Sequence, residues 1–171
     1  MNHGVIIQKK EQVKNIIHIS DIHIRTGNNI QARYDEYLYV FKDLITKLKK
    51  IRNIKNCIIV ITGDIFHHKN QIESSGIDLF SYIIKQLTDL TEVFIIMGNH
   101  DYRQYNSEEQ DLISALVKNS NYNNLYYLDK TGIYIINNLL VGLVAINDVL
   151  EDGDTSGMVE VLPEFPDPNS V

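Results

Sequence analysis

The chain has 171 residues, of which 44% are hydrophobic, and its 22 acidic and 16 basic residues give a formal net charge of −6 at pH 7. This length and apolar content suit one globular domain and exclude a wholly disordered or collagen-like chain. Residues 1–150 hold all 16 basic residues and an equal number of acidic ones, so the net charge comes entirely from residues 151–171. A neutral body lacks the strong electrostatic footprint of many nucleic-acid-binding proteins.

The cysteine content and the hydropathy pattern indicate in which cellular compartment the protein is expected. The single cysteine, Cys57, excludes an intrachain disulfide and favours a reducing environment. Residues 1–12 lack the apolar core of a signal peptide, so we expect an intracellular protein, cytoplasmic or nuclear, that is not secreted. One uncharged stretch, 131–147, is shorter than the roughly 20 residues of a spanning helix and is interrupted by Asn137-Asn138. We therefore expect no membrane contact and predict a hairpin there.

In chain order, the first two thirds of the sequence alternate between strand and helix patterns. Apolar runs at 15–19, 57–62 and 93–97 predict buried strands, the first of them central in its sheet. Between these runs, apolar residues at helical spacing predict helices over 33–51 and about 77–87. The pattern favours an α/β domain with a mainly parallel sheet.

The remaining elements are shorter. A capping-box pattern at 107–110 predicts a third helix that continues through Leu116. Three more strands are predicted over 125–128, 133–137 and 139–146, the last two joined by a tight turn at Asn137-Asn138. The predicted order is therefore β-α-β-α-β-α followed by a β-hairpin.

A polar cluster follows each of the three buried strands, at Ser20–His23, Gly63–His68 and Gly98–Asp101. Because the carboxyl ends of parallel strands meet at one edge of a sheet, these clusters should lie close together. Their oxygen and imidazole donors suit Mn²⁺, Fe or Zn²⁺ better than Ca²⁺ or Mg²⁺ alone. Each residue alone could be an ordinary turn or capping residue. The three clusters in order indicate a metal site.

These clusters resemble the motifs D-x-H, G-D-x-x-[DH] and G-N-H-[DE] of the calcineurin-like metallophosphoesterase superfamily. Asp21 and His23 match the first motif, Gly63-Asp64 with His67 the second, and residues 98–101 the third. Within the superfamily, Ser-Asp-Ile-His and Gly-Asp-Ile-Phe-His look most like the meiotic-recombination (SbcD-type) double-strand-break repair nucleases. The resemblance spans about residues 14–150 and implies an αββα sandwich, present here as roughly its first half.

By this resemblance, Asp21 and His23 would ligate a first divalent metal ion, Asp64 would bridge two ions, and Asn99 would ligate the second. Mn²⁺ is the expected metal, with Fe and Zn²⁺ as alternatives. Two such ions clamp a phosphodiester and activate a water molecule.

The resemblance also implies residues that act without binding metal. His100 would stabilise or protonate the scissile phosphate group, and Asp101 would orient His100. The expected substrate-contacting or supporting residues are Arg25, His67, His68 and Arg103.

The match to the family is incomplete. The family uses three later histidines as ligands, whereas this chain has none after His100. The first metal site would keep three of its four protein ligands and the second only Asp64 and Asn99, so the chain alone would bind one ion or none. The alternative is that acidic residues replace the histidines, the candidates being Asp148, Asp152 and Asp154.

We therefore expect the N-terminal part of a longer protein, divided into a 1–13 N-terminal extension, a truncated 14–150 metallophosphoesterase domain and a 151–171 acidic, proline-containing tail. The resemblance implies DNA as substrate and an SMC-like coiled-coil ATPase as partner. A phosphatase or small-molecule phosphodiesterase of the same superfamily is one alternative, and a catalytically incomplete interaction fragment is another. Half a sandwich leaves an apolar sheet face uncovered, which favours marginal stability or a homodimer.

Overall fold

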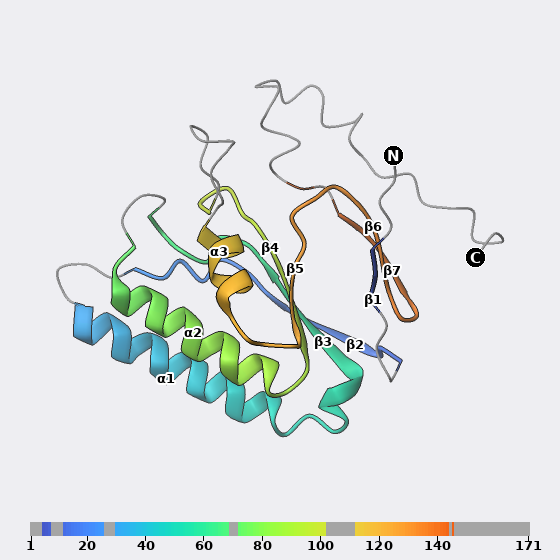
Figure 1. Ribbon diagram of the computed structural model, residues 1–171. Helices are drawn as coiled ribbons and strands as arrows, with labels where there is room; N and C mark the ends of the chain where they lie inside the picture. Colours follow the sequence, from blue (N-terminus) through green and yellow to red (C-terminus); the bar gives the residue numbers. More distant parts are fainter. Residues whose placement is uncertain are drawn as a thin grey trace.

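The computed structural model describes residues 5–7, 12–25, 30–68, 72–101, 112–143 and 145. It confirms the predicted α/β architecture (Figure 1). Its elements are β1 (Val5–Ile7), β2 (Asn15–Ile19), α1 (Ile30–Leu48), a 3₁₀ turn (Ile54–Asn56), β3 (Cys57–Thr62), α2 (Ser74–Thr88), β4 (Glu92–Ile96), α3 (Leu112–Asn119), β5 (Leu125–Tyr127), β6 (Gly132–Ile136) and β7 (Leu139–Leu143). Within these described ranges, no helix is both long and apolar enough to cross a membrane.

The main sheet has four parallel strands in the order β2-β3-β4-β5. Side chains of successive strand residues point to opposite faces, so β3 divides its apolar residues between two cores. Ile59 and Ile61 pack in the cluster that includes residues of α1, α2 and α3. Ile58 packs on the other side with Phe94 and with residues of β6 and β7. Both faces of β3 are therefore covered, as its uninterrupted apolar run predicts.

A second sheet, in the order β1-β6-β7, lies against the face opposite the helices. β6 and β7 are antiparallel and are joined at Asn137-Asn138, which confirms the predicted hairpin. Asn137 has a φ of 53°, the left-handed conformation that such two-residue turns require. The Asn138 side chain forms two hydrogen bonds with the backbone of Val13, so the hairpin is tied to the segment that leads into β2.

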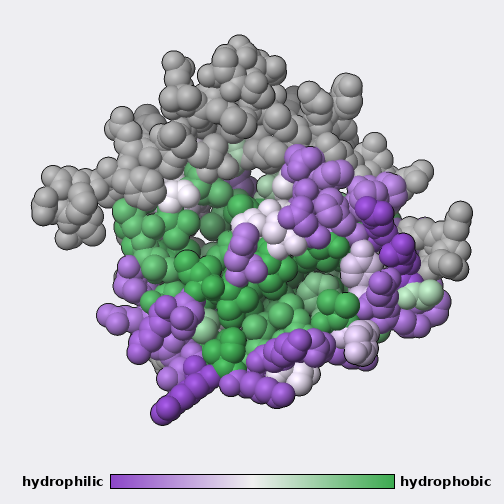
Figure 2. Space-filling model, turned by 180° about the vertical axis from the view of Figure 1, so that it is seen from behind, coloured by the Kyte–Doolittle hydropathy of each residue, from purple (hydrophilic) through white to green (hydrophobic). Residues whose placement is uncertain are grey.

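The prediction that the first buried strand is central was wrong. Among the described strands, β2 is the outer strand of the main sheet, and its Ile16 side chain is 55% exposed. His18 is also exposed, and its Nε2 lies 2.7 Å from Thr62 Oγ1 on β3. A broad hydrophobic area is visible on the back of the molecule (Figure 2). An apolar run indicates a strand whose two faces can both be buried. Which strands pair with its two edges is decided by the tertiary structure, not by the run itself.

Several predicted boundaries also differ. α1 begins at Ile30 and ends at Leu48, because the chain turns at Lys49-Lys50 before Ile51. Residues 5–7 form a strand parallel to β6, so the predicted N-terminal extension contributes to a sheet. The predicted capping box at 107–110 and the tail at 151–171 lie outside the described residues.

Candidate metal centre

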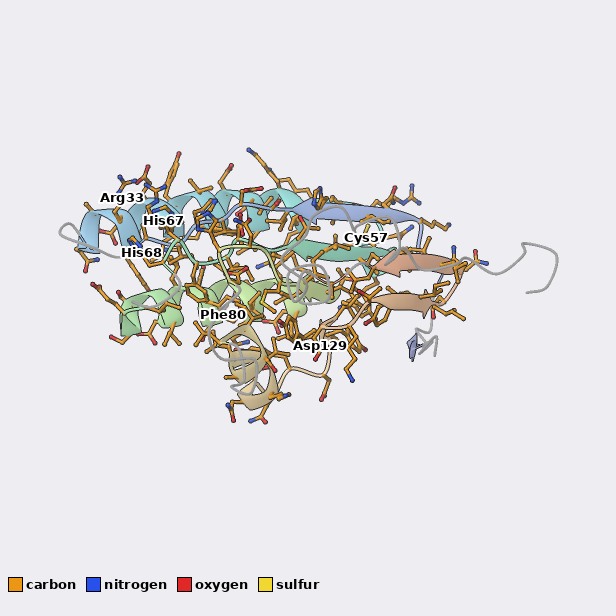
Figure 3. All side chains as sticks on the ribbon, turned by 90° about the horizontal axis from the view of Figure 1, so that it is seen from above. Arg33, Cys57, His67, His68, Phe80 and Asp129 are labelled. Atoms are coloured by element: carbon orange, nitrogen blue, oxygen red, sulfur yellow. The ribbon has the colours of Figure 1, made fainter. Side chains whose placement is uncertain are left out.

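The loops that follow β2 and β3 run side by side at the carboxyl edge of the main sheet, as the sequence predicts. The backbone N–H of His23 donates to the Asp64 carbonyl over 2.8 Å, and that of Ile24 donates to the Ile65 carbonyl over 2.7 Å. Viewed from above, Cys57 marks one end of this sheet, and His67 and His68 lie at the other (Figure 3). The polar clusters after the strands are therefore gathered at a single edge.

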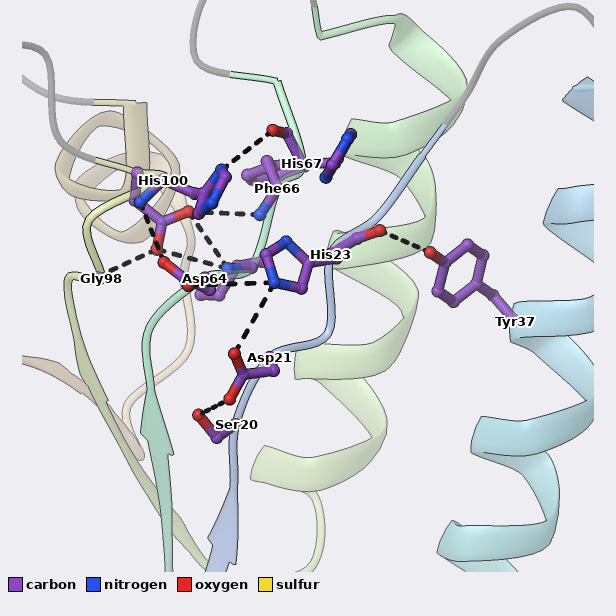
Figure 4. A network of polar contacts seen from close by, with 11 residues as sticks. Ser20, Asp21, His23, Tyr37, Asp64, Phe66, His67, Gly98 and His100 are labelled. Atoms are coloured by element: carbon purple, nitrogen blue, oxygen red, sulfur yellow. Dashed lines mark hydrogen bonds and ion pairs between the residues drawn. The ribbon is translucent and has the colours of Figure 1, made fainter.

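Asp21, His23 and Asp64 present a group of donors suited to one cation (Figure 4). Each offers one oxygen or nitrogen atom, and the three atoms lie within 4.8 Å of one another. His23 Nε2 is 3.6 Å from Asp21 Oδ1 and 3.9 Å from Asp64 Oδ2. The Asp21 side chain is 66% exposed and that of Asp64 14%, so the group opens to solvent on the Asp21 side. Two carboxylates and an imidazole fit a divalent transition-metal ion.

The backbone is left-handed at all three of these residues, with φ of 55° at Asp21, 48° at His23 and 51° at Asp64. Residues with a Cβ rarely adopt this conformation, which costs on the order of 1–2 kcal/mol each. Tyr37 on α1 helps to hold His23, because its hydroxyl donates to the His23 carbonyl over 2.5 Å. Sequence reasoning missed Tyr37, since a half-buried helical tyrosine has the pattern of an ordinary core aromatic.

Two glycines bring the loops after β3 and β4 into backbone contact. Gly63 has a φ of 84°, and a Cβ on it would collide with the backbone of Gly98. A Cβ on Gly98 would in turn collide with Asp64, including its Oδ1 atom. The glycines in the G-D and G-N motifs are therefore required by the close approach of the two loops at the carboxylate.

Asp64 is held by the loop that carries Asn99 and His100. The His100 backbone N–H donates to Asp64 Oδ1 over 2.9 Å. With its amide nitrogen turned toward the carboxylate, Asn99 lies 3.2 Å from Asp64 Oδ2. Asn99 is exposed and lies next to Asp64.

Asp101 plays a different part from the one predicted for it. Its buried carboxylate accepts hydrogen bonds of 3.1–3.3 Å from the backbone N–H groups of Ile65, Phe66 and Gly98. Burial raises the pKa of Asp101, and these backbone donors partly oppose the rise. Asp101 therefore holds the loop after β4 against the loop after β3. The His100 ring, which it was expected to orient, has its Nδ1 3.3 Å from the His67 carbonyl oxygen instead.

The structure describes three of the four predicted substrate-contacting or supporting residues, which are Arg25, His67 and His68, and Arg25 is exposed. His67 lies beside His23 and His100, with ring centroids 5.5 and 5.9 Å away. Loss of solvent, and then the charge of Arg25, lower the pKa of His67, so its ring is neutral at pH 7. His68 is exposed, with its ring centroid 4.6 Å from that of His67. Arg103 and the alternative ligands Asp148, Asp152 and Asp154 lie outside the described residues.

Residues 14–164 match the family described as Calcineurin-like phosphoesterase. The chain belongs to the calcineurin-like phosphoesterase family. The chemistry implied by this family is metal-dependent phosphoester hydrolysis. The match extends over all three motifs and over the elements from β2 to β7.

Two viral proteins are similar to this calcineurin-like chain. "Uncharacterized protein R555" of Acanthamoeba polyphaga mimivirus is 37% identical over 138 residues, which are 80% of this chain and 10% of the viral protein. "Putative phosphoesterase 244L" of Invertebrate iridescent virus 6 is 28% identical over 131 residues, which are 75% of this chain and 42% of that protein. The chain thus spans less than half the length of each of these relatives.

Proposed function

We propose that this chain supplies the metal-binding edge of a phosphodiesterase that cleaves nucleic acid. The observation that carries the proposal is the convergence of Asp21, His23 and Asp64 on a single point at the end of the parallel sheet. Divalent ions bound there, Mn²⁺ by preference and Fe or Zn²⁺ as alternatives, supply Lewis-acid activation of the phosphoryl group and of water.

The residues of the chain then have separate tasks. The exposed Asp21 carboxylate, the His23 ring and Asp64 would hold the first ion, and Asp64 with Asn99 would hold a second. The His100 Nδ1 proton is donated to the His67 carbonyl, which leaves Nε2 of His100 as the nitrogen that can exchange a proton with the leaving oxygen. His67 lies beside this ring, and Arg25 is near enough to His67 to lower its pKa, so both can contact the phosphate.

A nuclease substrate is supported by the local sequences Ser-Asp-Ile-His and Gly-Asp-Ile-Phe-His. By the same resemblance we propose an SMC-like coiled-coil ATPase as partner, and the single cysteine supports an intracellular location. A different observation favours a small phosphodiester as the alternative substrate. The body of the chain is neutral, and a largely apolar groove of about 390 Å³, which includes Tyr37, Val40 and Phe41, opens beside Asp21. The salt dependence of activity distinguishes the two substrates. Cleavage of DNA should fall steeply as the salt concentration rises, whereas turnover of a small phosphodiester should not.

Metal binding and phosphodiester hydrolysis are tested together on the purified chain. Calorimetry with Mn²⁺ and a DNA cleavage assay are applied to the wild type, Asp64→Asn, His100→Ala and the control His18→Asn, which alters a histidine outside the site. We expect Asp64→Asn to weaken Mn²⁺ binding at least tenfold, and His100→Ala to keep the ion and lose hydrolysis.

Two results would count against this assignment. Loss of Mn²⁺ in His100→Ala would make His100 a ligand, and cleavage by Asp64→Asn at the wild-type rate would place the chemistry elsewhere. Binding of one ion without cleavage by the wild type would support the remaining alternative, in which this chain is a metal-binding part of a site completed by other segments.

A further inference from the structure

Three histidines from three different loops surround one space at the edge of the sheet. His23 follows β2, His67 follows β3 and His100 follows β4. Each offers one ring nitrogen, and the three nitrogens lie within 4.8 Å of one another. The ring centroids of His23 and His100 are 4.9 Å apart, with the planes at 85°. Figure 4 shows the three rings above Asp21, with His23 nearest to it.

The hydrogen bonding of these rings leaves nitrogen lone pairs available. Nδ1 of His23 and Nδ1 of His67 are shielded from solvent and have no hydrogen-bond partner among the described residues. His100 donates Nδ1–H to a backbone carbonyl, the arrangement by which metal-binding histidines are commonly oriented. Buried nitrogens without partners are uncommon in folded proteins and call for an explanation such as an ion.

We propose that His23, His67 and His100 form a second cation site, which binds one Zn²⁺, Ni²⁺ or Cu²⁺ ion through nitrogen atoms alone. Imidazole suits these ions, whereas Mn²⁺ favours carboxylate oxygens. With metal–nitrogen distances of about 2.0–2.1 Å, tetrahedral ligands lie about 3.4 Å apart, so the nitrogens, now within 4.8 Å of one another, must approach by up to about 1.4 Å. Arg25 adds a positive charge near His67, but its side chain is exposed and the Asp21 and Asp64 carboxylates lie on the other side of His23.

The two cation sites share His23 and therefore compete. Nε2 of His23 faces the carboxylates of Asp21 and Asp64, whereas its Nδ1 is the buried nitrogen without a partner. A neutral imidazole carries one lone pair, so either nitrogen can bind an ion while the other holds the proton. An ion at the three imidazoles leaves His23 with Nε2–H toward the carboxylates, and so it displaces Mn²⁺ from them. This inference does not depend on the proposed substrate.

The test separates the nitrogen site from the carboxylate site. In an Asp21→Asn background, Cu²⁺ binding is measured by calorimetry and by electron paramagnetic resonance, with and without His67→Asn. The control is His18→Asn in the same background, because His18 is an exposed histidine on β2 that lies outside the group. Thermal unfolding followed by circular dichroism establishes that each variant is folded.

We expect one Cu²⁺ ion with nitrogen hyperfine coupling in the Asp21→Asn chain, binding at least tenfold weaker after His67→Asn and unchanged within twofold after His18→Asn. In the wild type, Zn²⁺ should release bound Mn²⁺, and His67→Asn should raise the Zn²⁺ concentration needed at least tenfold. The proposal is overturned if His67→Asn binds Cu²⁺ as the background does, or if the spectrum shows oxygen ligands only. Neither result would affect Mn²⁺ binding by Asp21 and Asp64, which is measured separately.

Discussion

The hydrogen bond from Tyr37 to the His23 carbonyl offers a direct test of how the fold supports the metal centre. Tyr37→Phe removes one oxygen atom and keeps the ring, which packs against the core beneath α1. The change leaves a partly buried carbonyl without its donor, at a residue whose backbone is left-handed. We therefore expect Tyr37→Phe to reduce both stability and metal affinity.

The size of the effect follows from these contacts. A hydrogen bond of this kind contributes about 0.5–1.5 kcal/mol net, and since the carbonyl is only partly buried, water can replace part of it. We expect the free energy of unfolding to fall by about 1 kcal/mol. The left-handed conformation of His23 costs on the order of 1–2 kcal/mol, so without the hydrogen bond the backbone can relax. This relaxation would move the His23 ring away from Asp21 and Asp64. Since 1.4 kcal/mol corresponds to a factor of ten, Mn²⁺ should bind about 3–10-fold more weakly.

The same helix supplies the control. Tyr39 is 77% exposed, so Tyr39→Phe removes a hydroxyl from α1 without touching the loop that carries the ligands. Urea unfolding in EDTA gives the stability of both variants, and calorimetry with Mn²⁺ gives their affinities. If Tyr37→Phe matches Tyr39→Phe within about 0.3 kcal/mol and twofold in affinity, the hydrogen bond does not position His23.

Two other changes test the loop contacts. Gly63→Ala should lower the free energy of unfolding by about 2–5 kcal/mol. The alanine would have to adopt a left-handed backbone conformation, and its Cβ would collide with the Gly98 backbone. A loss below about 1 kcal/mol in urea unfolding would contradict this reasoning. Because burial raises the pKa of Asp101 above 3.8, its contribution to stability is complete below that pH and declines as pH rises through the pKa of the folded state. The stability advantage of wild type over Asp101→Asn should therefore be smaller at pH 7 than near pH 4, and the opposite trend would mean that the backbone donors dominate.

The strands and motifs of this chain could be predicted because they leave local patterns. A strand covered on both faces, such as β3, needs an uninterrupted apolar run, and the polar residues that follow it stand out against that run. Parallel pairing then brings the ends of β2, β3 and β4 to one edge whatever the rest of the fold. The convergence of Asp21, His23 and Asp64 follows from these two facts.

The features that could not be predicted depend on contacts without a local signal. The sequence of β2 would be equally apolar whether its outer edge were paired or open. The position of β2 in the sheet therefore cannot be predicted from its sequence. Asp101 follows His100 directly, and a motif cannot distinguish a carboxylate that binds the neighbouring ring from one that binds three backbone N–H groups. The grouping of His67 with His23 depends on the two loops running side by side, which the backbone hydrogen bonds and the pairing of Ile24 with Phe66 show.

The left-handed residues explain why the first two ligands can share one loop. Residues i and i+2 of an extended strand point the same way but stand roughly 6–7 Å apart along it. Left-handed φ values at Asp21 and His23 curl the chain after β2, and Asp21 Oδ1 then lies 3.6 Å from His23 Nε2. This conformation is unfavourable for both residues, so other bonds must hold it. The His23 backbone has one on each side, because its N–H donates to Asp64 and its carbonyl accepts from Tyr37. The geometry of the D-x-H motif therefore depends on β3 and α1 as well as on the loop itself.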